Sequence, residues 1–156
     1  MTKVARKALH DLRVAHERLE REEEIEGFRV IWVAAVAINR AIGHVLAKID
    51  SKDSPRMAAA IRSQYESWKA DRQKSRIFFE FIESERNTLL KEYEAGYLSG
   101  PIEVIVLGGT EVFELKENLF CPLGEGPYAG EDCRDVLAEA IAWWDSQLST
   151  IEQNAT

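Results

Sequence analysis

The sequence is poor in the residues that bind metals or form covalent cross-links. Its 156 residues include two cysteines and three histidines, and no histidine follows His44. Cys121 and Cys133 lack Cys-x-x-Cys spacing and have no histidine nearby, so neither a zinc site nor a framework of disulfides is indicated. His10 and His16 are six residues apart and do not share one face of a helix. We therefore expect neither a metal nor a cofactor.

Long apolar runs are also absent. The longest strongly apolar stretch, residues 30–38, is too short to cross a bilayer, and the first residues are charged without the following apolar segment of a secretory signal. Neither Gly-x-Ser-x-Gly nor a glycine-rich loop ending in Gly-Lys-Ser/Thr occurs, so a serine-nucleophile elbow and a P-loop are not indicated. We expect a cytoplasmic protein without a membrane span.

Negative charge is concentrated in the last third of the chain. The formal net charge is −7, yet residues 1–100 carry 18 Lys and Arg against 16 Asp and Glu, whereas residues 101–156 carry 2 against 11. A free-standing nucleic-acid binder normally presents a basic face, because its cations neutralise phosphates. The overall charge disfavours that class, but the first hundred residues leave room for a local basic patch.

Apolar residues recur at helical spacing through the first hundred residues. We predict helices over 2–24, 28–49 and 55–72, and a fourth that ends at Gly96, a residue suited to terminate a helix. Residues 28–49 are apolar nearly all round, which is typical of a central helix surrounded by its neighbours. Because the connections are short, the helices within residues 1–98 are predicted to pack antiparallel as a bundle.

The pattern changes after residue 100. Residues 101–116 alternate apolar and polar side chains around a Gly-Gly turn, which predicts a β-hairpin that must pack on the bundle to be stable. A last helix is expected at 131–153. The predicted fold is mainly α, an antiparallel four- to five-helix bundle with a short β-hairpin inserted before the last helix, in a single domain of residues 1–156.

Two helix starts have recognisable capping residues. Asp53 or Ser54 precedes the third predicted helix, and Pro55 suits its first turn. Glu131 or Asp132 precedes the last one. These side chains are expected to accept hydrogen bonds from the unpaired N–H groups of the first helical turn.

A charged residue interrupts an apolar ridge of the fourth predicted helix. The residues spaced by four along this ridge are Phe78, Ile82, Arg86 and Leu90. Arg86 therefore occupies a position that packing alone would assign to Leu or Ile. A guanidinium removed from water needs a carboxylate partner or a ligand. We expect Arg86 to be buried or half-buried, either in an ion pair or at a cleft.

Polar residues of the second predicted helix complete a candidate anion site. Arg40 and His44 are four residues apart and share one face of that helix. If the second and fourth helices pack antiparallel, these side chains and the pair Arg86-Asn87 converge on one groove, with donors suited to a phosphate, an RNA backbone or a carboxylate. The alternative is a purely structural network that fixes the register of the bundle.

Three short segments resemble HEPN-type helical proteins of prokaryotes. They are Arg40-Ala-Ile-Gly-His-Val45-Leu46, Tyr65-Glu-Ser-Trp68, and residues 79–87 with Arg86-Asn87 at their end, and the match covers under half of the chain. In the ribonuclease members of that family, an Arg, the polar residue beside it and a His a few residues further on meet across a homodimer to cut RNA. The resemblance implies a helical scaffold of the toxin–antitoxin-related kind and a homodimer.

The chain departs from the family at that histidine. Lys91, Glu92 and Tyr93 occupy the positions where it would fall. RNA cleavage profits from a group whose pKa is near neutrality, and Lys, Glu and Tyr ordinarily titrate far from it. The resemblance therefore implies the scaffold more strongly than the reaction.

The expected function is that of a non-catalytic, homodimeric module that binds RNA or a protein through Arg40, His44, Arg86 and Asn87. One alternative is a metal-independent endoribonuclease around Arg86 and Asn87, with Tyr93 or His44 as an atypical base. Another is an interaction module whose acidic last third binds a basic partner such as a cognate toxin.

Overall fold

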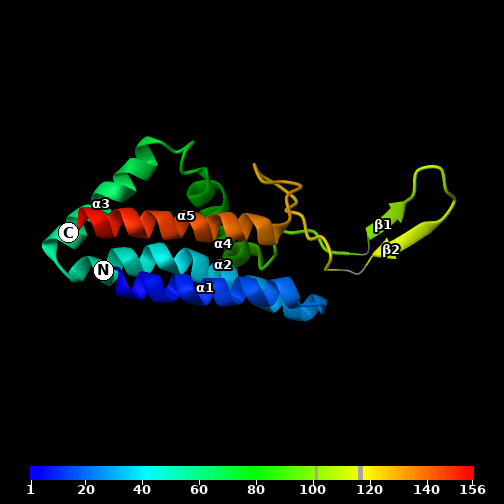
Figure 1. Cartoon of the computed structure of the whole chain (residues 1–156), viewed down its shortest axis with the longest axis horizontal. Helices are drawn as coiled ribbons and strands as arrows, with labels where there is room; N and C mark the ends of the chain where they lie inside the picture. The colour runs from blue at the N-terminus through cyan, green and yellow to red at the C-terminus, as the bar shows by residue number, and fades with distance from the viewer. Residues whose placement is uncertain (101, 116–117) are drawn as a thin grey trace.

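The computed structural model describes residues 1–100, 102–115 and 118–156, and within them the chain is mainly helical (Figure 1), as the sequence predicts. The elements in chain order are α1 (Lys3–Arg21), α2 (Ile25–Lys48), the 3-10 turn η1 (Asp50–Lys52), α3 (Pro55–Ala70), the π-helical turn η2 (Ile77–Ile82), α4 (Glu83–Glu92), β1 (Ile102–Ile105), β2 (Val112–Leu115) and α5 (Cys133–Asn154).

The helices pack around an aromatic core. α1, α2 and α5 lie lengthwise, while α3 and the continuous helix formed by η2 and α4 pack against them (Figure 1). The two ends of the chain lie at the same end of the bundle. The largest fully buried side chains include Trp32, Trp144, Phe28, Phe78 and Phe81. Burial of such rings, each of which removes roughly 150–250 Å² from water, dominates the stability of the core.

Capping side chains define where two helices begin. Ser54 accepts a hydrogen bond from the N–H of Met57 at 3.1 Å, with Pro55 in the first turn of α3. Asp132 accepts one from the N–H of Arg134 at 2.9 Å at the start of α5. Both interactions satisfy N–H groups that a helix cannot pair internally. The predicted starts of these two helices are confirmed.

The first turn of α1 is capped by a residue from a different element. The buried carboxylate of Asp50, in η1, accepts hydrogen bonds from the N–H groups of Val4 at 3.0 Å and Ala5 at 2.9 Å. A negative charge is favoured there because the helix dipole is positive at its N-terminus. Asp50 thus ties the connection between α2 and α3 to the start of α1.

An ion-pair network joins α1 to the end of α5. Nη2 of Arg6 donates to Glu152 at 2.8 Å, and Nη1 pairs with Asp145. The backbone N–H and the hydroxyl of Thr2 also donate to Glu152. Hydrogen bonds from Arg6 and then from Thr2 lower the pKa of Glu152 to about 2, against the opposing effect of burial.

Two sequence-based predictions for α2 are wrong. The helix begins at Ile25 and includes Gly27, whereas the predicted helix begins at residue 28. It is also not surrounded by its neighbours, because Val30, Ala34 and Ala37 on its outward side are exposed. The apolar residues around this helix serve two surfaces: an inward one that packs in the core and an outward one that meets solvent.

By length and composition, residues 25–52 could cross a membrane. The continuous apolar run 30–38 is too short to do so by itself, but the helix extends well beyond it at both ends. In this fold 33% of the most apolar window is buried. The core helices of soluble proteins can be equally long and apolar. Composition alone therefore does not distinguish a membrane-spanning helix from a core helix.

The helix that contains Arg86 also ends earlier than predicted. α4 stops at Glu92, and Tyr93 follows in the left-handed region with φ 54°. Gly96, predicted to terminate the helix, lies in the following loop. Its missing side chain is required for another reason, because a Cβ there would lie 2.1 Å from Oε1 of Glu85.

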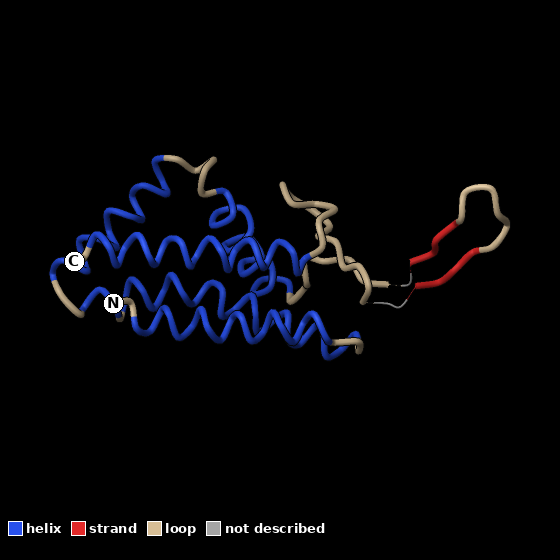
Figure 2. The backbone as a smooth tube through the Cα atoms, viewed as in Figure 1, coloured by secondary structure: helices blue, strands red, loops and turns tan. Residues whose placement is uncertain are grey.

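Residues 102–105 and 112–115 pair as antiparallel strands, with Ile102 opposite Leu115 and Ile105 opposite Val112. Pro101 and Lys116, the ends of the predicted hairpin, lie outside the described residues. The strands stand beyond the ends of the helices (Figure 2), so the expectation that they pack on the bundle is wrong. The turn between them, closed by a hydrogen bond from Gly109 N–H to Val106 O at 3.0 Å, is longer than the Gly-Gly turn expected.

Candidate functional site

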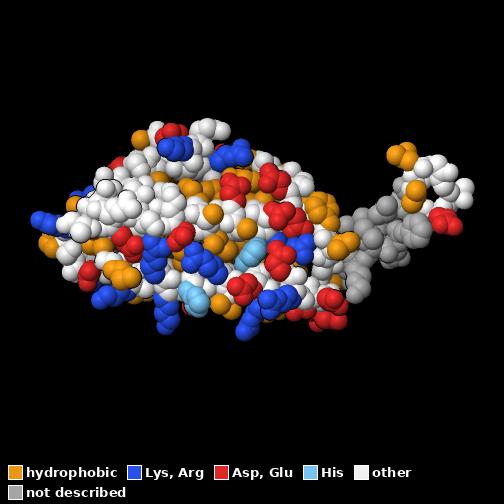
Figure 3. Space-filling view, viewed as in Figure 1, with side chains coloured by type: hydrophobic (Ala, Val, Ile, Leu, Met, Phe, Trp, Pro, Cys, Tyr) orange, Lys and Arg blue, Asp and Glu red, His pale blue; other side chains and the backbone are white. Residues whose placement is uncertain are grey.

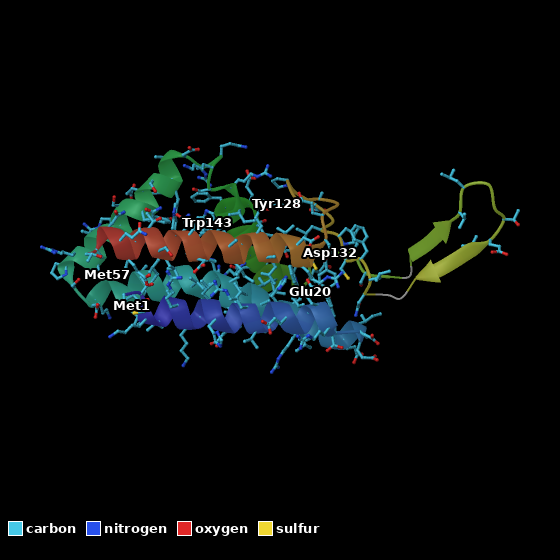
Figure 4. The ribbon with its side chains drawn as sticks, viewed as in Figure 1. Met1, Glu20, Met57, Tyr128, Asp132 and Trp143 are labelled. Carbon is cyan, nitrogen blue, oxygen red and sulfur yellow. The ribbon has the colours of Figure 1, made fainter. Side chains whose placement is uncertain are left out.

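An aromatic cluster joins α3, η2 and α5. Trp68 lies against Phe78, with ring centroids 5.1 Å apart, and against Trp143, at 4.9 Å. Trp143 projects from the middle of α5 (Figure 4). The indole N–H of Trp68 donates to Oε1 of Gln147 at 2.7 Å, so the polar atom of the buried ring is satisfied. The rings of the cluster are therefore closely packed, with the indole N–H of Trp68 paired.

A cavity of about 220 Å³ opens above this cluster, between α2 and α3. Its lining residues are Arg40, Gly43, His44, Leu46, Ala47, Ile61, Tyr65, Trp68 and Phe78. Tyr65 is 40% exposed, while Trp68 and Phe78 are buried beneath it. The volume is below the roughly 300 Å³ of the smallest usual ligand pockets, so the cavity suits one ring-sized group rather than a whole cofactor.

Two of the predicted site residues, Arg40 and His44, line this cavity. The guanidinium of Arg40 lies 5.7 Å from the ring centroid of Phe78, within the range of a cation–π interaction. Nη2 of Arg40 is 3.4 Å from Oε1 of Glu83, and both side chains are about one third exposed. This ion pair joins α2 to α4, as the structural alternative predicts, but it leaves Arg40 accessible from the cavity.

The other two predicted residues, Arg86 and Asn87, do not join this cavity. Both are exposed, and Nη1 of Arg86 donates to Oδ1 of Asn87 at 3.0 Å. The expectation of a buried or half-buried Arg86 is wrong. Arg40, His44, Arg86 and Asn87 are therefore not gathered in one groove, because Arg86 and Asn87 are absent from the cavity lining.

Helix geometry explains the error over Arg86. A ridge of i, i+4 neighbours turns about 40° round the helix at each step, because the helix repeats every 3.6 residues. The π-helical turn η2 changes the register again. As a result Leu89, 7% exposed, faces the core, whereas Leu90 is 66% exposed.

Tyr93, the candidate atypical base, lies apart from Arg40 and His44. Its ring is 68% exposed and lies beneath the guanidinium of Arg29, at 5.8 Å. It is not among the residues that line the aromatic cavity. Of the two alternative bases, only His44 shares a cavity with an arginine.

A larger cleft is not predicted by the sequence. It has a volume of about 620 Å³ and lies between η2–α4 and the loops at 94–98 and 123–128. Its carboxylates come from Glu80, Glu85, Glu92, Glu94 and Glu125. Gly124, Gly126 and Pro127 of the second loop form part of one wall, and nothing in their spacing signals a cleft.

Glu85 lies in this cleft and is half-buried. Burial raises its pKa above the ordinary value, against the lowering effect of a hydrogen bond from Gly96 N–H and of the nearby indole of Trp32. Trp32 is fully buried, and its N–H lacks a hydrogen bond of good geometry. Across the described residues, no three His, Cys, Asp or Glu side chains are grouped so as to hold a metal ion.

Basic and acidic side chains occupy different parts of the surface. On the face shown in Figure 3, Lys and Arg side chains gather along α1, and acidic side chains gather toward the loop end of the bundle. Near the aromatic cavity, Lys69 lies over the exposed ring of Tyr65, with Nζ 5.0 Å from the centroid. Lys69 and Arg40 thus lie beside the cavity, and each is paired with a glutamate, Lys69 with Glu66 at 2.7 Å and Arg40 with Glu83.

The fold and the cavity define a mainly helical protein with a small aromatic-floored cavity whose lining includes Arg40 and His44. Comparisons with protein families, with curated proteins and with solved structures find no match.

Proposed function

We propose that this chain is a non-catalytic, HEPN-like helical protein that binds single-stranded RNA as a homodimer. The aromatic cavity with Arg40 and His44 on its rim is the observation that supports this function. Proteins bind single-stranded RNA by stacking bases on aromatic rings and placing cations along the phosphates. A cavity sized for one ring beside the Arg40 guanidinium and the His44 imidazole matches that chemistry.

Each part of the cavity has a role in this proposal. Tyr65, the exposed ring, stacks with a base, and Trp68 and Phe78 hold Tyr65 in place through edge contacts at 5.8 and 6.4 Å. Arg40 and His44 donate to a phosphate. Lys48, exposed one helical turn beyond His44, extends the cationic track along α2.

The outward faces of α2 and α4 support the homodimer. Val30 is 61% exposed and Leu90 66%. Arg29 of α2 lies over Tyr93 at the end of α4, so the two faces are continuous. Exposed apolar surface of this kind is typical of protein interfaces. In the proposed dimer the two copies meet there, with Arg86 and Asn87 at the interface.

The positions of the histidines favour binding over catalysis. Arg86 is paired with Asn87, and no histidine follows His44 in the sequence. Without imidazole, the Arg86-Asn87 pair has no group that exchanges a proton near pH 7. The endoribonuclease alternative is favoured by one observation, that Arg40 and His44 line the same cavity.

Fluorescence anisotropy with a labelled single-stranded RNA tests the proposal. Tyr65→Ala is expected to weaken binding roughly 5- to 100-fold, the usual effect of removing one base-stacking ring. Arg40→Ala is expected to weaken binding and reduce its salt dependence. His44→Ala should weaken it similarly.

The matched control is Phe120→Ala, an exposed aromatic residue, 42% accessible, that lies outside the cavity lining. It should bind RNA as the unmodified protein does. The proposal fails if RNA does not bind, or if Tyr65→Ala and Arg40→Ala bind normally. RNA that is cut, with the cutting lost in His44→Ala, would establish the endoribonuclease alternative instead.

A basic protein partner is the second candidate, favoured by the carboxylates around the large cleft. A double variant, Glu92→Gln with Glu125→Gln, would bind such a partner more weakly and with a smaller dependence on salt. Its binding of RNA should not change. A complex insensitive to both salt and these substitutions would exclude this candidate.

A further inference from the structure

We infer that α2 packs antiparallel against α2 of a second copy of this chain, in a register centred on Ala37. The inference rests on the proposed homodimer and goes beyond it, because it fixes the relative orientation of the two copies and the residues that meet.

α2, one of the lengthwise helices of the bundle (Figure 1), carries a stripe of outward-facing residues along its whole length. The members of this α2 stripe recur at steps of three or four residues, a spacing that keeps side chains on one side of a helix. All are exposed except the half-buried Ala41, and they are Glu26, Val30, Ala34, Ala37, Ala41, His44 and Lys48. The opposite side of α2 faces the core, where Asn39 accepts a hydrogen bond from the indole N–H of Trp144 at 2.9 Å. The α2 stripe is thus the surface of this helix that the bundle leaves uncovered.

The middle of the α2 stripe is narrow. Ala34, Ala37 and Ala41 present only methyl groups, so another helix can approach to about 8 Å, the short end of the usual range of interaxial distances. Val33 and Val45 lie on the two flanks and are half-buried against the core. They would extend an apolar contact on either side of the alanines.

The two ends of the α2 stripe carry opposite charges. Glu26 is at the N-terminal end and Lys48 at the C-terminal end. In the part of the chain that the structure describes, neither side chain forms an ion pair. An antiparallel second copy brings each beside the opposite charge, whereas a parallel copy brings like charges together. Charge complementarity therefore favours a second copy in the antiparallel orientation.

A register centred on Ala37 places every member of the α2 stripe within one residue of direct opposition to another member. A two-fold axis through this point makes each contact occur twice, as in other self-complementary interfaces. The opposed pairs are Ala37 with Ala37, Ala34 with Ala41, Val30 with His44, and Glu26 with Lys48.

This register also relates the dimer to the aromatic cavity. His44 lines that cavity and belongs to the α2 stripe. Val30 of the second copy therefore lies beside the same histidine. The two His44 positions of the dimer are about 21 Å apart along the helix axis, because an α-helix rises 1.5 Å per residue.

A membrane surface matches the α2 stripe less well than a second copy does. Helices that lie on a membrane bury large apolar side chains such as Trp, Phe and Leu. Three alanines and one valine supply little such area.

Cysteine cross-linking with oxidised glutathione, followed by non-reducing electrophoresis, tests the orientation and the register. Ala37→Cys is expected to give a disulfide-linked dimer, because the two copies of residue 37 meet at the axis. Ala34→Cys and Ala41→Cys, introduced singly, should not, because each lies about 9 Å or more from its own counterpart along the axis. The double variant with both substitutions should cross-link.

Ala59→Cys, at an exposed alanine of α3, is the matched control, and the unmodified chain, whose two cysteines are buried, is the second. Neither should cross-link. Self-cross-linking of all three single stripe variants would indicate a parallel contact and overturn the inference. Absence of a cross-link in both Ala37→Cys and the double variant would overturn it as well.

Exchange of the charges tests the pairing of the two ends. Glu26→Lys and Lys48→Glu, introduced singly, are each expected to raise the Kd of the dimer roughly tenfold, because two attractive contacts become repulsive. Combined in one chain, they should return the Kd close to its original value. Sedimentation at graded protein concentrations measures these constants, and circular dichroism checks the folding of each variant.

Asp135→Lys is the control for charge, because it changes the net charge as Glu26→Lys does but lies on α5, behind the inward side of α2. Its Kd should equal that of the unmodified chain. A double charge variant that dissociates as readily as the single ones would refute the antiparallel pairing.

RNA binding by the same proteins distinguishes this inference from the proposed function. If Ala37→Cys cross-links but no RNA binds, the RNA-binding function fails and the α2 contact holds. A chain that binds RNA as a monomer overturns the α2 contact alone. So does a monomer that binds vesicles of phosphatidylcholine and phosphatidylserine and loses this binding in Val30→Lys, since the stripe would then face lipid.

Discussion

At the scale of single residues, the polar groups that hold this fold together are carboxylates satisfied from distant parts of the chain. Asp50 caps α1 from η1, and Glu152 receives hydrogen bonds from Thr2 and Arg6 across 150 and 146 positions. Each such carboxylate offsets the cost of its partial burial through several donors. Their removal is therefore expected to cost more than the loss of an exposed ion pair.

Glu152→Gln is predicted to lower the free energy of unfolding by about 1 kcal/mol near neutral pH, allowing for solvent screening of this partly exposed group. The folded-state pKa of Glu152, about 2, is below its ordinary value of 4.5. The ionised group therefore stabilises the fold above about pH 4.5 and loses this contribution as the pH falls through about 2.

Urea denaturation of both proteins between pH 7 and pH 2 checks this prediction. The difference between them should shrink steadily as the pH decreases below 4.5. Glu17→Gln, which alters an exposed carboxylate of α1, should show no such difference. A gap between Glu152→Gln and the unmodified protein that widens toward acid would contradict the proposed network.

Gly96 and Glu85 make a second prediction at this scale. Gly96→Ala places a Cβ 2.1 Å from the Glu85 carboxylate, which must move and lose the hydrogen bond from Gly96 N–H. We expect a loss of about 1–2 kcal/mol in the free energy of unfolding, because the carboxylate is largely buried. Adding Glu85→Ala removes the collision, so the double variant should be destabilised by less than the sum of the two single variants.

Chemical denaturation of the four proteins completes this double-mutant cycle. Gly109→Ala is the control, because the new Cβ would lie no closer than 3.6 Å to its nearest neighbour, the carbonyl oxygen of Val106. Gly124→Ala is unsuitable, because its Cβ would lie 3.3 Å from Leu98. Strictly additive effects of Gly96→Ala and Glu85→Ala would show that the two residues are not in contact.

At the scale of elements, the N-terminus of α5 is held by a network of side-chain hydrogen bonds. Asp132 accepts hydrogen bonds from Cys121 and Arg134, and Arg134 in turn donates to the carbonyls of Asn118 and Leu119. Burial alone would raise the pKa of Asp132, but these donors lower it below its ordinary value. The cap therefore fixes both the helix and the loop before it.

Asp132→Ala is predicted to destabilise the protein by about 3 kcal/mol, because it removes a cap and leaves the largely buried Arg134 without its partner. Thermal and urea unfolding measure the effect. Asp135→Ala, an exposed acidic residue in the same helical turn, is the matched control and should change stability by no more than about 0.5 kcal/mol. Equal losses in the two variants would contradict the role of Asp132.

The positions of the helices show how much of this fold the sequence predicts. Apolar periodicity locates the five α-helices, and Ser54 and Asp132 mark two of their starts, because these signals are local. The two faces of α2 are not predicted, since only packing decides which apolar side is covered. The site is predicted in part, because Arg40 and His44 share a helix face and line one cavity. Arg86 does not line it, because i, i+4 neighbours rotate about 40° round the helix at each step and the π-helical turn η2 changes the register.

At the scale of the whole molecule, α2 presents apolar residues to solvent along the face next to α4. The proposed homodimer covers this face. Val30→Lys and Leu90→Glu, introduced singly, are therefore predicted to convert a dimer into a monomer by placing charge in an apolar interface. Analytical ultracentrifugation of the unmodified chain and both variants measures the mass.

The control for the dimer is Val4→Lys, because Val4 is an exposed valine, 37% accessible, at the start of α1, where its N–H bonds Asp50 beyond the far end of α2 from Val30. It should leave the mass unchanged. A monomeric unmodified chain, or a dimer that survives both interface substitutions, would refute the proposed interface. The proposed RNA-binding role of the cavity is tested separately.

The most direct test of the central claim is photo-crosslinking of single-stranded RNA containing 4-thiouridine, followed by mapping of the crosslinked peptides by mass spectrometry. The proposal predicts crosslinks concentrated in α3 at Tyr65, lost when Tyr65 is replaced by Ala and reduced in Arg40→Ala. Crosslinks confined to α1 or to the Arg86 face of α4, unaffected by these substitutions, would contradict it.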